Sequence, residues 1–135
     1  MPILHLQEGA PMIVTQHLAD WRPYPFRISE TRLEFDLAPR KTRVRSQIDF
    51  HRSAPGDLVL DGAGLKTLAL SVDGQPLDLT LIDGDGQRLV IPSAALPDSF
   101  TFEALVEIDP EANTALEGLY LSGGIFCTQC EAEGF

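Results

Sequence analysis

The clearest strand pattern in the chain is Phe100-Thr101-Phe102-Glu103-Ala104-Leu105-Val106-Glu107-Ile108-Asp109, where one set of alternate residues is apolar throughout. Successive side chains of a β-strand point to opposite faces of a sheet, so this period of two predicts a strand with one face turned to a core. The stretch therefore decides in favour of a β fold.

The same period recurs elsewhere in the chain. Alternating or short apolar runs predict further strands at 26–37, 43–50, 58–60, 66–72 and 89–91. In the first run the parity changes across Ser29-Glu30-Thr31, which predicts a bulge. In the second run the polar set is predicted to form a solvated strand face, and its members are Arg43, Arg45, Gln47 and Asp49.

Turn signals separate the runs. Asp73-Gly74 predicts a hairpin because a type I′ turn needs two positive φ values, and Leu77, Leu79 and Leu81 then predict the returning strand. A second hairpin turn is predicted at residues 83–86. No long helix is predicted, so the spacing indicates an all-β antiparallel sandwich of about seven to nine short strands.

Composition restricts the function. The chain has 135 residues and a formal net charge of −10. Such a surface repels phosphate backbones and attracts cations, so we expect no nucleic acid partner. No apolar run is long enough for a membrane span, and the start lacks the pattern of a secretory signal. We therefore expect a cytoplasmic protein without a membrane partner.

The C-terminal stretch 123–135 is open to three interpretations. Cys127 and Cys130 form a C-x-x-C pair that could be a thiol or zinc site, but zinc needs four ligands. The histidines that could complete it are isolated in sequence: His5, His17 and His51. Alternatively, Gln129, Glu131 and Glu133 could bind an amine, since alternate carboxylates on extended backbone share a face. An ordinary acidic loop is the third interpretation.

The C-terminal third also resembles a known family. The similar segments are 113–123 and 126–135, and weaker similarity extends back through 58–62, 41–44, 36–37 and 20–23. Together they resemble the N-terminal domain of bacterial aminopeptidase N, a zinc metallopeptidase. The residues themselves predict only a lead-in segment at 1–20. The resemblance implies, at 21–135, a saddle-like sheet or sandwich that is incomplete at its C-terminal end.

The resemblance also implies roles for residues. Gln129 would line the substrate pocket, and Glu131 would bind the free α-amine of a peptide. The zinc ligands and catalytic residues of the family have no matching positions in this chain, so zinc is expected outside it. We expect no catalytic or metal-binding residue here and no activity of the chain alone.

Two partners follow from the resemblance, namely the N-terminus of a peptide substrate and a catalytic domain. Without that domain, exposed strand edges and apolar surface favour self-association of the chain. The alternative to an enzyme fragment is a free-standing β-sandwich that serves as a binding or adaptor module.

Overall fold

The fold is all-β in a computed structural model that describes residues 15, 17–83 and 86–130. The strands are β1 (Phe26–Asp36), β2 (Thr42–Arg52), β3 (Leu58–Asp61), β4 (Lys66–Val72), β5 (Gln75–Pro76), β6 (Arg88–Ile91), β7 (Ser99–Ile108), β8 (Gly118–Ser122) and β9 (Ile125–Gln129). Short 3₁₀ turns are η1 (Leu18–Asp20), η2 (Leu79–Leu81) and η3 (Ser93–Ala95). The predicted all-β class is confirmed. None of the described helical turns is long and apolar enough to cross a membrane.

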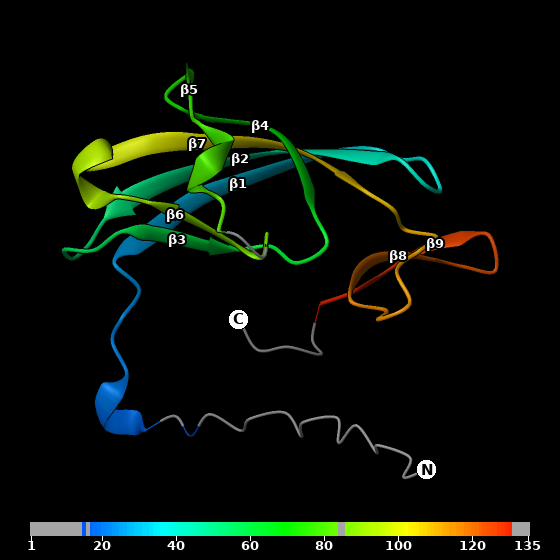
Figure 1. Ribbon diagram of the computed structural model, residues 1–135, viewed down its shortest axis with the longest axis horizontal. Coiled ribbons are helices and arrows are strands. Elements are labelled where there is room, and N and C mark those ends of the chain that lie inside the picture. The colour runs from blue at the N-terminus through cyan, green and yellow to red at the C-terminus, as the bar shows by residue number, and fades with distance from the viewer. Residues whose placement is uncertain (1–14, 16, 84–85, 131–135) are drawn as a thin grey trace, which may run out of the picture.

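The strands form one large sheet and two small ribbons (Figure 1). The large sheet is five-stranded with the order β1-β2-β7-β4-β5, and the ribbons pair β3 with β6 and β8 with β9. All pairs are antiparallel. The stretch with the clearest alternation, β7, lies in the middle of the sheet between β2 and β4.

The bulge predicted in the first strand is confirmed. The register of β1 against β2 shifts between Ile28 and Glu30. After the shift Leu33 lies opposite Ser46 and Phe35 opposite Val44, so the apolar residues of both halves of β1 share one face of the sheet.

The hairpin at Asp73-Gly74 is also confirmed, because both residues have positive φ, 48° and 76°. The returning strand is shorter than predicted. Strand β5 ends at Pro76, and Leu79–Leu81 form the 3₁₀ turn η2 instead of a strand. The carboxylate of Asp78 accepts a hydrogen bond of 2.9 Å from the Thr80 amide, and this local cap competes with strand pairing. Of the second predicted turn, residues 84–85 lie outside the described residues.

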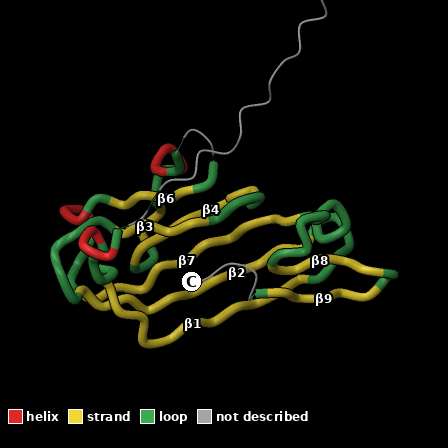
Figure 2. The backbone as a smooth tube through the Cα atoms, turned by 90° about the horizontal axis from the view of Figure 1, so that it is seen from below, coloured by secondary structure: helices red, strands yellow, loops and turns green. Residues whose placement is uncertain are grey.

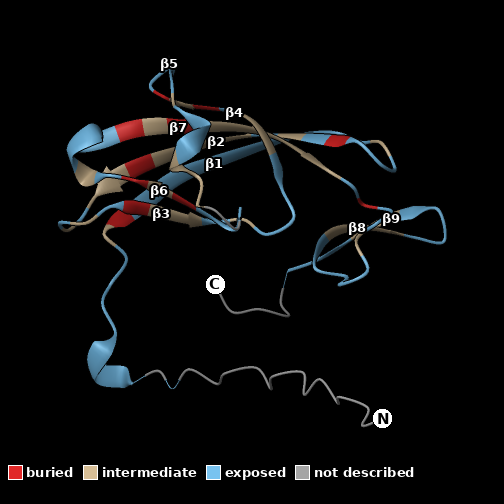
Figure 3. Cartoon of the chain, viewed as in Figure 1, coloured by how far each residue is buried: buried red, intermediate tan, exposed pale blue. Residues whose placement is uncertain are grey.

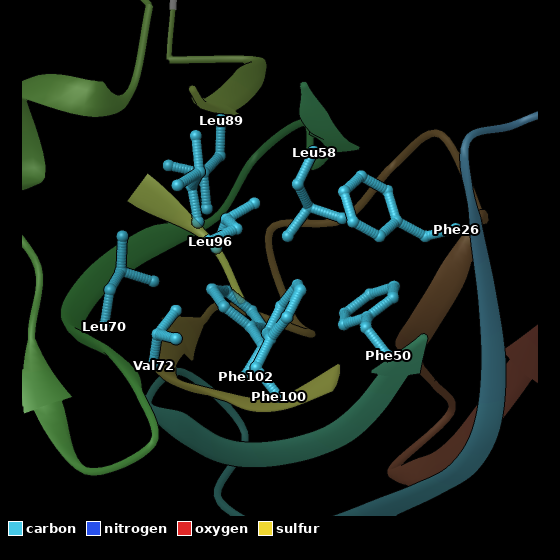
Figure 4. Close-up of a cluster of buried hydrophobic side chains, with 10 residues drawn as sticks. Phe26, Phe50, Leu58, Leu70, Val72, Leu89, Leu96, Phe100 and Phe102 are labelled. Carbon is cyan, nitrogen blue, oxygen red and sulfur yellow. The ribbon is translucent and has the colours of Figure 1, made fainter. Parts of the chain in front are cut away.

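One core holds the large sheet and the β3–β6 ribbon together (Figures 3 and 4). Buried phenylalanines from the sheet pack against buried aliphatic residues of the ribbon, and the main members are Phe26, Phe50, Phe100, Phe102, Leu58, Leu89 and Ile91. The rings of Phe50 and Phe100 stack with centroids 5.4 Å apart. Burial of each such side chain contributes about 1.5–3 kcal/mol, so this cluster is the main source of stability.

The ribbon covers only part of the apolar face. A hollow of about 340 Å³ is lined by Leu60 and Leu89 of the ribbon together with Val44, Val106 and Ile108 of the sheet. On the edge strand beside it, Leu33 and Phe35 are 55% and 47% exposed. The predicted sandwich is therefore a five-stranded sheet with a two-stranded second layer at one end (Figure 2).

The opposite face of the sheet is polar, as predicted for the second strand. Arg43 lies opposite Glu107 and Arg45 opposite Glu34 on neighbouring strands. Nζ of Lys66 lies 3.2 Å from Oε1 of Glu107. Cross-strand pairs of opposite charge suit a solvated face and contribute little each.

Candidate functional site

The C-terminal stretch folds as the β8–β9 hairpin, at the end of the molecule opposite to the β3–β6 ribbon (Figure 1). Gly123 and Gly124 connect the two strands with φ of 57° and 82°. Both values are positive, as a two-residue type I′ turn requires. The sequence analysis did not predict β9, although a Gly-Gly pair between two short apolar runs is a hairpin signal.

The register of this hairpin places Gln129 at its open end. Gln129 lies opposite Gly118, and Cys127 lies opposite Tyr120. Because alternate residues share a face, Gln129, Cys127 and Tyr120 lie on one side of the hairpin. Gly118 has no side chain to cover its partner, and Gln129 is exposed.

The segment before β8 is organised by Asn113. The Nδ2 atom of Asn113 donates hydrogen bonds to the carbonyl oxygens of Glu117 at 2.7 Å and Leu119 at 3.0 Å. Its Oδ1 atom accepts a hydrogen bond from the Leu116 amide at 3.2 Å. Leu116 and Gly118 both have left-handed backbone, with φ of 59° and 67°. No sequence pattern identifies this role, because all the partners are backbone groups.

Further contacts tie the hairpin to the turn between β1 and β2. The Leu121 amide donates to the Pro110 carbonyl at 2.9 Å, and Pro110 is buried. The Glu111 amide donates to the Pro39 carbonyl at 2.9 Å. The Glu111 carboxylate pairs with Arg40, and this hydrogen bond raises the pKa of the Arg40 guanidinium.

Thr42 stabilises the same turn from inside. It is fully buried, and its Oγ1 atom donates to the Ala38 carbonyl at 2.7 Å while accepting from the Ala38 amide at 3.0 Å. A buried hydroxyl with both functions satisfied carries no desolvation penalty for an unpaired group. The turn between β1 and β2 is therefore well ordered, and it is the turn to which Glu111, in the segment that leads into β8, is hydrogen-bonded.

Of the residues predicted to form an amine site, only Gln129 belongs to the described part. Glu131 and Glu133 lie outside the described residues. Their placement beside Gln129, and the role of Glu131 in binding an amine, therefore stay predictions.

The interpretation of this stretch as a zinc site finds no partner groups in the described residues. There, no three His, Cys, Asp or Glu side chains gather in a way that could hold a metal ion. Cys127 and Cys130 are free, and Cys127 lies 3.6 Å from the Ile125 carbonyl oxygen. The Nε2 atom of His51 lies 2.9 Å from Oγ of Ser29, and its Nδ1 atom lies 2.9 Å from Oγ of Ser99. His51 thus has a structural role within the sheet. His5 lies outside the described residues.

Several known proteins are similar to this chain, although no protein-family model matches it. Aminopeptidase N of Caulobacter vibrioides is 50% identical over 121 residues, which cover 88% of this chain and 14% of that protein. Aminopeptidase N of Escherichia coli is 42% identical over 118 residues, 86% of this chain and 13% of that protein. Aminopeptidase N of Haemophilus influenzae is 34% identical over 118 residues, which cover 86% of this chain and 14% of that protein.

A solved structure shows a similar fold. It is the crystal structure of Legionella pneumophila aminopeptidase A in complex with aspartic acid, with a TM-score of 0.72 and 24% identity. The match covers 88% of this chain and 14% of that one. The chain thus spans only a small part of the length of each protein that it matches.

Proposed function

The chain is homologous to the N-terminal part of bacterial aminopeptidase N, and we propose that it serves as the N-terminal β region of a zinc-dependent aminopeptidase. In that enzyme, which releases N-terminal amino acids from peptides, Gln129 lines the substrate pocket and Glu131 binds the substrate α-amine. The observation that carries the proposal is the 50% identity to a protein named aminopeptidase N. The exposed position of Gln129 at the end of β9 supports it.

The chemistry of these two residues suits an ammonium group. The amide oxygen of Gln129 and the carboxylate of Glu131 are acceptors, and hydrogen bonds between charged partners are about twice as strong as neutral ones. A carboxylate enclosed by the enzyme and its substrate is satisfied only by a terminal ammonium, which selects the chain end. The net charge of −10 favours approach of a cationic group.

Zinc belongs to the remainder of the enzyme in this proposal. The described residues offer no metal cluster, and the sequence contains no His-Glu-x-x-His motif. When bound, zinc would polarise the scissile carbonyl and activate a water molecule. The chain contributes substrate binding only, and alone it does not hydrolyse peptides.

The remaining parts of the proposal concern partners and location. The partners are the N-terminus of a peptide and the catalytic domain, with no role for nucleic acid or membrane. The location is cytoplasmic, and the free thiols of Cys127 and Cys130 are consistent with a reducing compartment.

A chimera tests the proposal directly. The chain replaces its matching segment in Caulobacter vibrioides aminopeptidase N, and hydrolysis of an aminoacyl chromogenic substrate is measured for the chimera and its Glu131→Gln variant. Loss of charge-assisted hydrogen bonds of about 1.5–3 kcal/mol predicts a fall in kcat/KM of about tenfold to a hundredfold. Glu117→Gln makes the same chemical change at an exposed carboxylate before β8 and is the matched control.

Each outcome decides between the proposed function and its alternative. An active chimera that loses activity in Glu131→Gln and keeps it in Glu117→Gln supports the enzyme. Equal kcat/KM for the chimera and Glu131→Gln contradicts the amine-binding role. An inactive chimera that still binds zinc and remains folded favours a free-standing binding or adaptor module.

A further inference from the structure

We propose that Asn113 is a positioning residue for the amine-binding end of β9, an inference that rests on the proposed function. Asn113 touches no substrate. It holds the segment that pairs with Gln129, and through that segment it sets where Gln129 lies.

The side chain of Asn113 uses its full donor capacity on this segment. Both Nδ2 hydrogens are engaged, by the carbonyl oxygens of Glu117 at 2.7 Å and Leu119 at 3.0 Å. The Oδ1 atom accepts from the Leu116 amide at 3.2 Å. One side chain therefore connects three points of the 116–119 backbone.

This backbone needs an external restraint. Leu116 has a φ of 59°, which is unfavourable for a residue with a Cβ atom, and Gly118 is left-handed as well. The hydrogen bonds of Asn113 bracket both residues and so oppose relaxation to ordinary backbone. Without them, the segment can adopt other conformations ahead of β8.

The position of Gln129 depends on the same restraint through strand register. Gly118 lies opposite Gln129 and Leu119 lies opposite Thr128, so a displaced 118–119 backbone displaces the end of β9. No described residue of the hairpin is fully buried, and a two-stranded hairpin alone is marginally stable in water. Packing within the hairpin is therefore a weak substitute for Asn113.

The chemistry required at this position is specific. The Asn113→Asp substitution would keep the size of the side chain and an acceptor for Leu116, but it would place negative charge against two carbonyl oxygens. Asn113→Asp and Asn113→Ala should therefore both fail to position the segment. Thr114→Ala is the matched control, because Thr114 is an exposed neighbour outside these hydrogen bonds.

The first measurement is amide hydrogen exchange in the full chain. The Leu116 amide donates directly to Asn113, so its exchange should accelerate about twofold to tenfold in Asn113→Ala, the change expected for losing one hydrogen bond. The Leu119–Thr128 region should also exchange faster, while the centre of β7 should not change. An unchanged Leu116 rate would overturn the proposal without reference to enzyme activity.

The second measurement uses the chimera with Caulobacter vibrioides aminopeptidase N and two competitive inhibitors. One is an amino acid hydroxamate and the other is the same compound without its α-amine. The ratio of their inhibition constants reports amine recognition and does not depend on the fraction of active enzyme. We expect Asn113→Ala and Asn113→Asp to reduce this ratio by about tenfold, and Thr114→Ala to leave it unchanged.

Glu131→Gln separates failure of this inference from failure of the proposed function. If Glu131→Gln reduces the ratio of inhibition constants to about one and the Asn113 variants leave it unchanged, the positioning role is wrong and the amine site is supported. If Glu131→Gln leaves the ratio unchanged, the proposed amine site is wrong and the positioning role falls with it.

Discussion

Arg52 at the end of β2 should be the most important charged side chain for stability. It is 16% exposed, and its guanidinium donates hydrogen bonds to the carbonyl oxygens of Gly56, Ser93 and Leu96 at 3.3, 3.2 and 3.0 Å. It also donates to the Ser93 hydroxyl at 2.7 Å and lies 5.1 Å from the centre of the Phe26 ring. One side chain thus joins the turn after β2, the segment before β7 and the edge of the core.

Replacement of Arg52 by Met keeps much of the apolar stem and removes every donor. The carbonyl oxygens of Gly56 and Leu96 then lose the Arg52 donor, and the Ser93 carbonyl keeps only its hydrogen bond from the Leu96 amide. Each of the three lost hydrogen bonds costs about 1 kcal/mol. Loss of the contact with Phe26 adds about 0.5–2 kcal/mol. The ion pair with Asp98 adds little, because that carboxylate is 93% exposed. We expect a total loss of about 3–5 kcal/mol, a large share of the about 5–15 kcal/mol typical of a domain.

Urea unfolding followed by far-ultraviolet circular dichroism measures this change in the free energy of unfolding. Trp21 is 67% exposed and is a poor fluorescence probe of the core. Arg52→Lys should recover only part of the loss, because an ammonium cannot serve carbonyl groups in several directions as the guanidinium fork does. Arg32→Met is the control, since Arg32 is 68% exposed in its 2.7 Å pair with Glu30 and should contribute less than about 1 kcal/mol. Similar losses of unfolding free energy for Arg52→Met and Arg32→Met would show that the hydrogen bonds of Arg52 do not stabilise the fold.

Two further predictions concern the edge strand and a capped turn. The exposed apolar side chains of β1 should cause the chain to associate at high concentration in sedimentation experiments, and Phe35→Lys should shift it towards monomer because a charge on an edge strand opposes pairing. Glu34→Gln changes the net charge by the same amount on the opposite face of β1, and it should not shift the chain towards monomer. A strictly monomeric wild type would contradict the prediction. The hydrogen bond from the Thr80 amide lowers the pKa of Asp78 below its ordinary value of 3.8. The Asp78 carboxylate therefore stabilises the fold above pH 3.8, and this stabilisation is lost as the pH falls through the lowered pKa. The stability difference between wild type and Asp78→Asn should therefore shrink on acidification in urea titrations, and an Asp78 that titrates at or above 3.8 by NMR would contradict this.

Much of the fold could be predicted from the sequence, because a strand with one buried and one exposed face has alternating apolar and polar side chains. The alternation in β7 and β2, the bulge at Ile28 to Glu30 and the turn at Asp73-Gly74 are all local, and all are confirmed. The strand predicted at 77–81 is wrong for a related reason. Leu77, Leu79 and Leu81 do alternate, but the side chain of Asp78 caps a 3₁₀ turn at Leu79–Leu81, and this local hydrogen bond favours the turn over strand pairing.

The candidate site was less accessible to sequence reasoning. The residue types at Gln129 and Glu131 are compatible with an amine site and equally with an ordinary acidic loop, and only the resemblance implied a role for each. The restraint on that stretch comes from Asn113, whose partners are backbone carbonyl and amide groups that every sequence contains. A pattern of side chains therefore cannot identify it.

Antiparallel strands with one apolar face follow from the amino-acid sequence alone, because period-two alternation and turn residues act over a few positions. The folded chain is needed to see that β7 pairs between β2 and β4, and that the β3–β6 ribbon covers one end of the apolar face and leaves Leu33 and Phe35 exposed. It also shows that Gln129 stands opposite a glycine at the open end of a hairpin. These features depend on which distant segments meet, and strands of similar pattern can satisfy their backbone hydrogen bonds with many partners, so packing of the whole chain makes the choice.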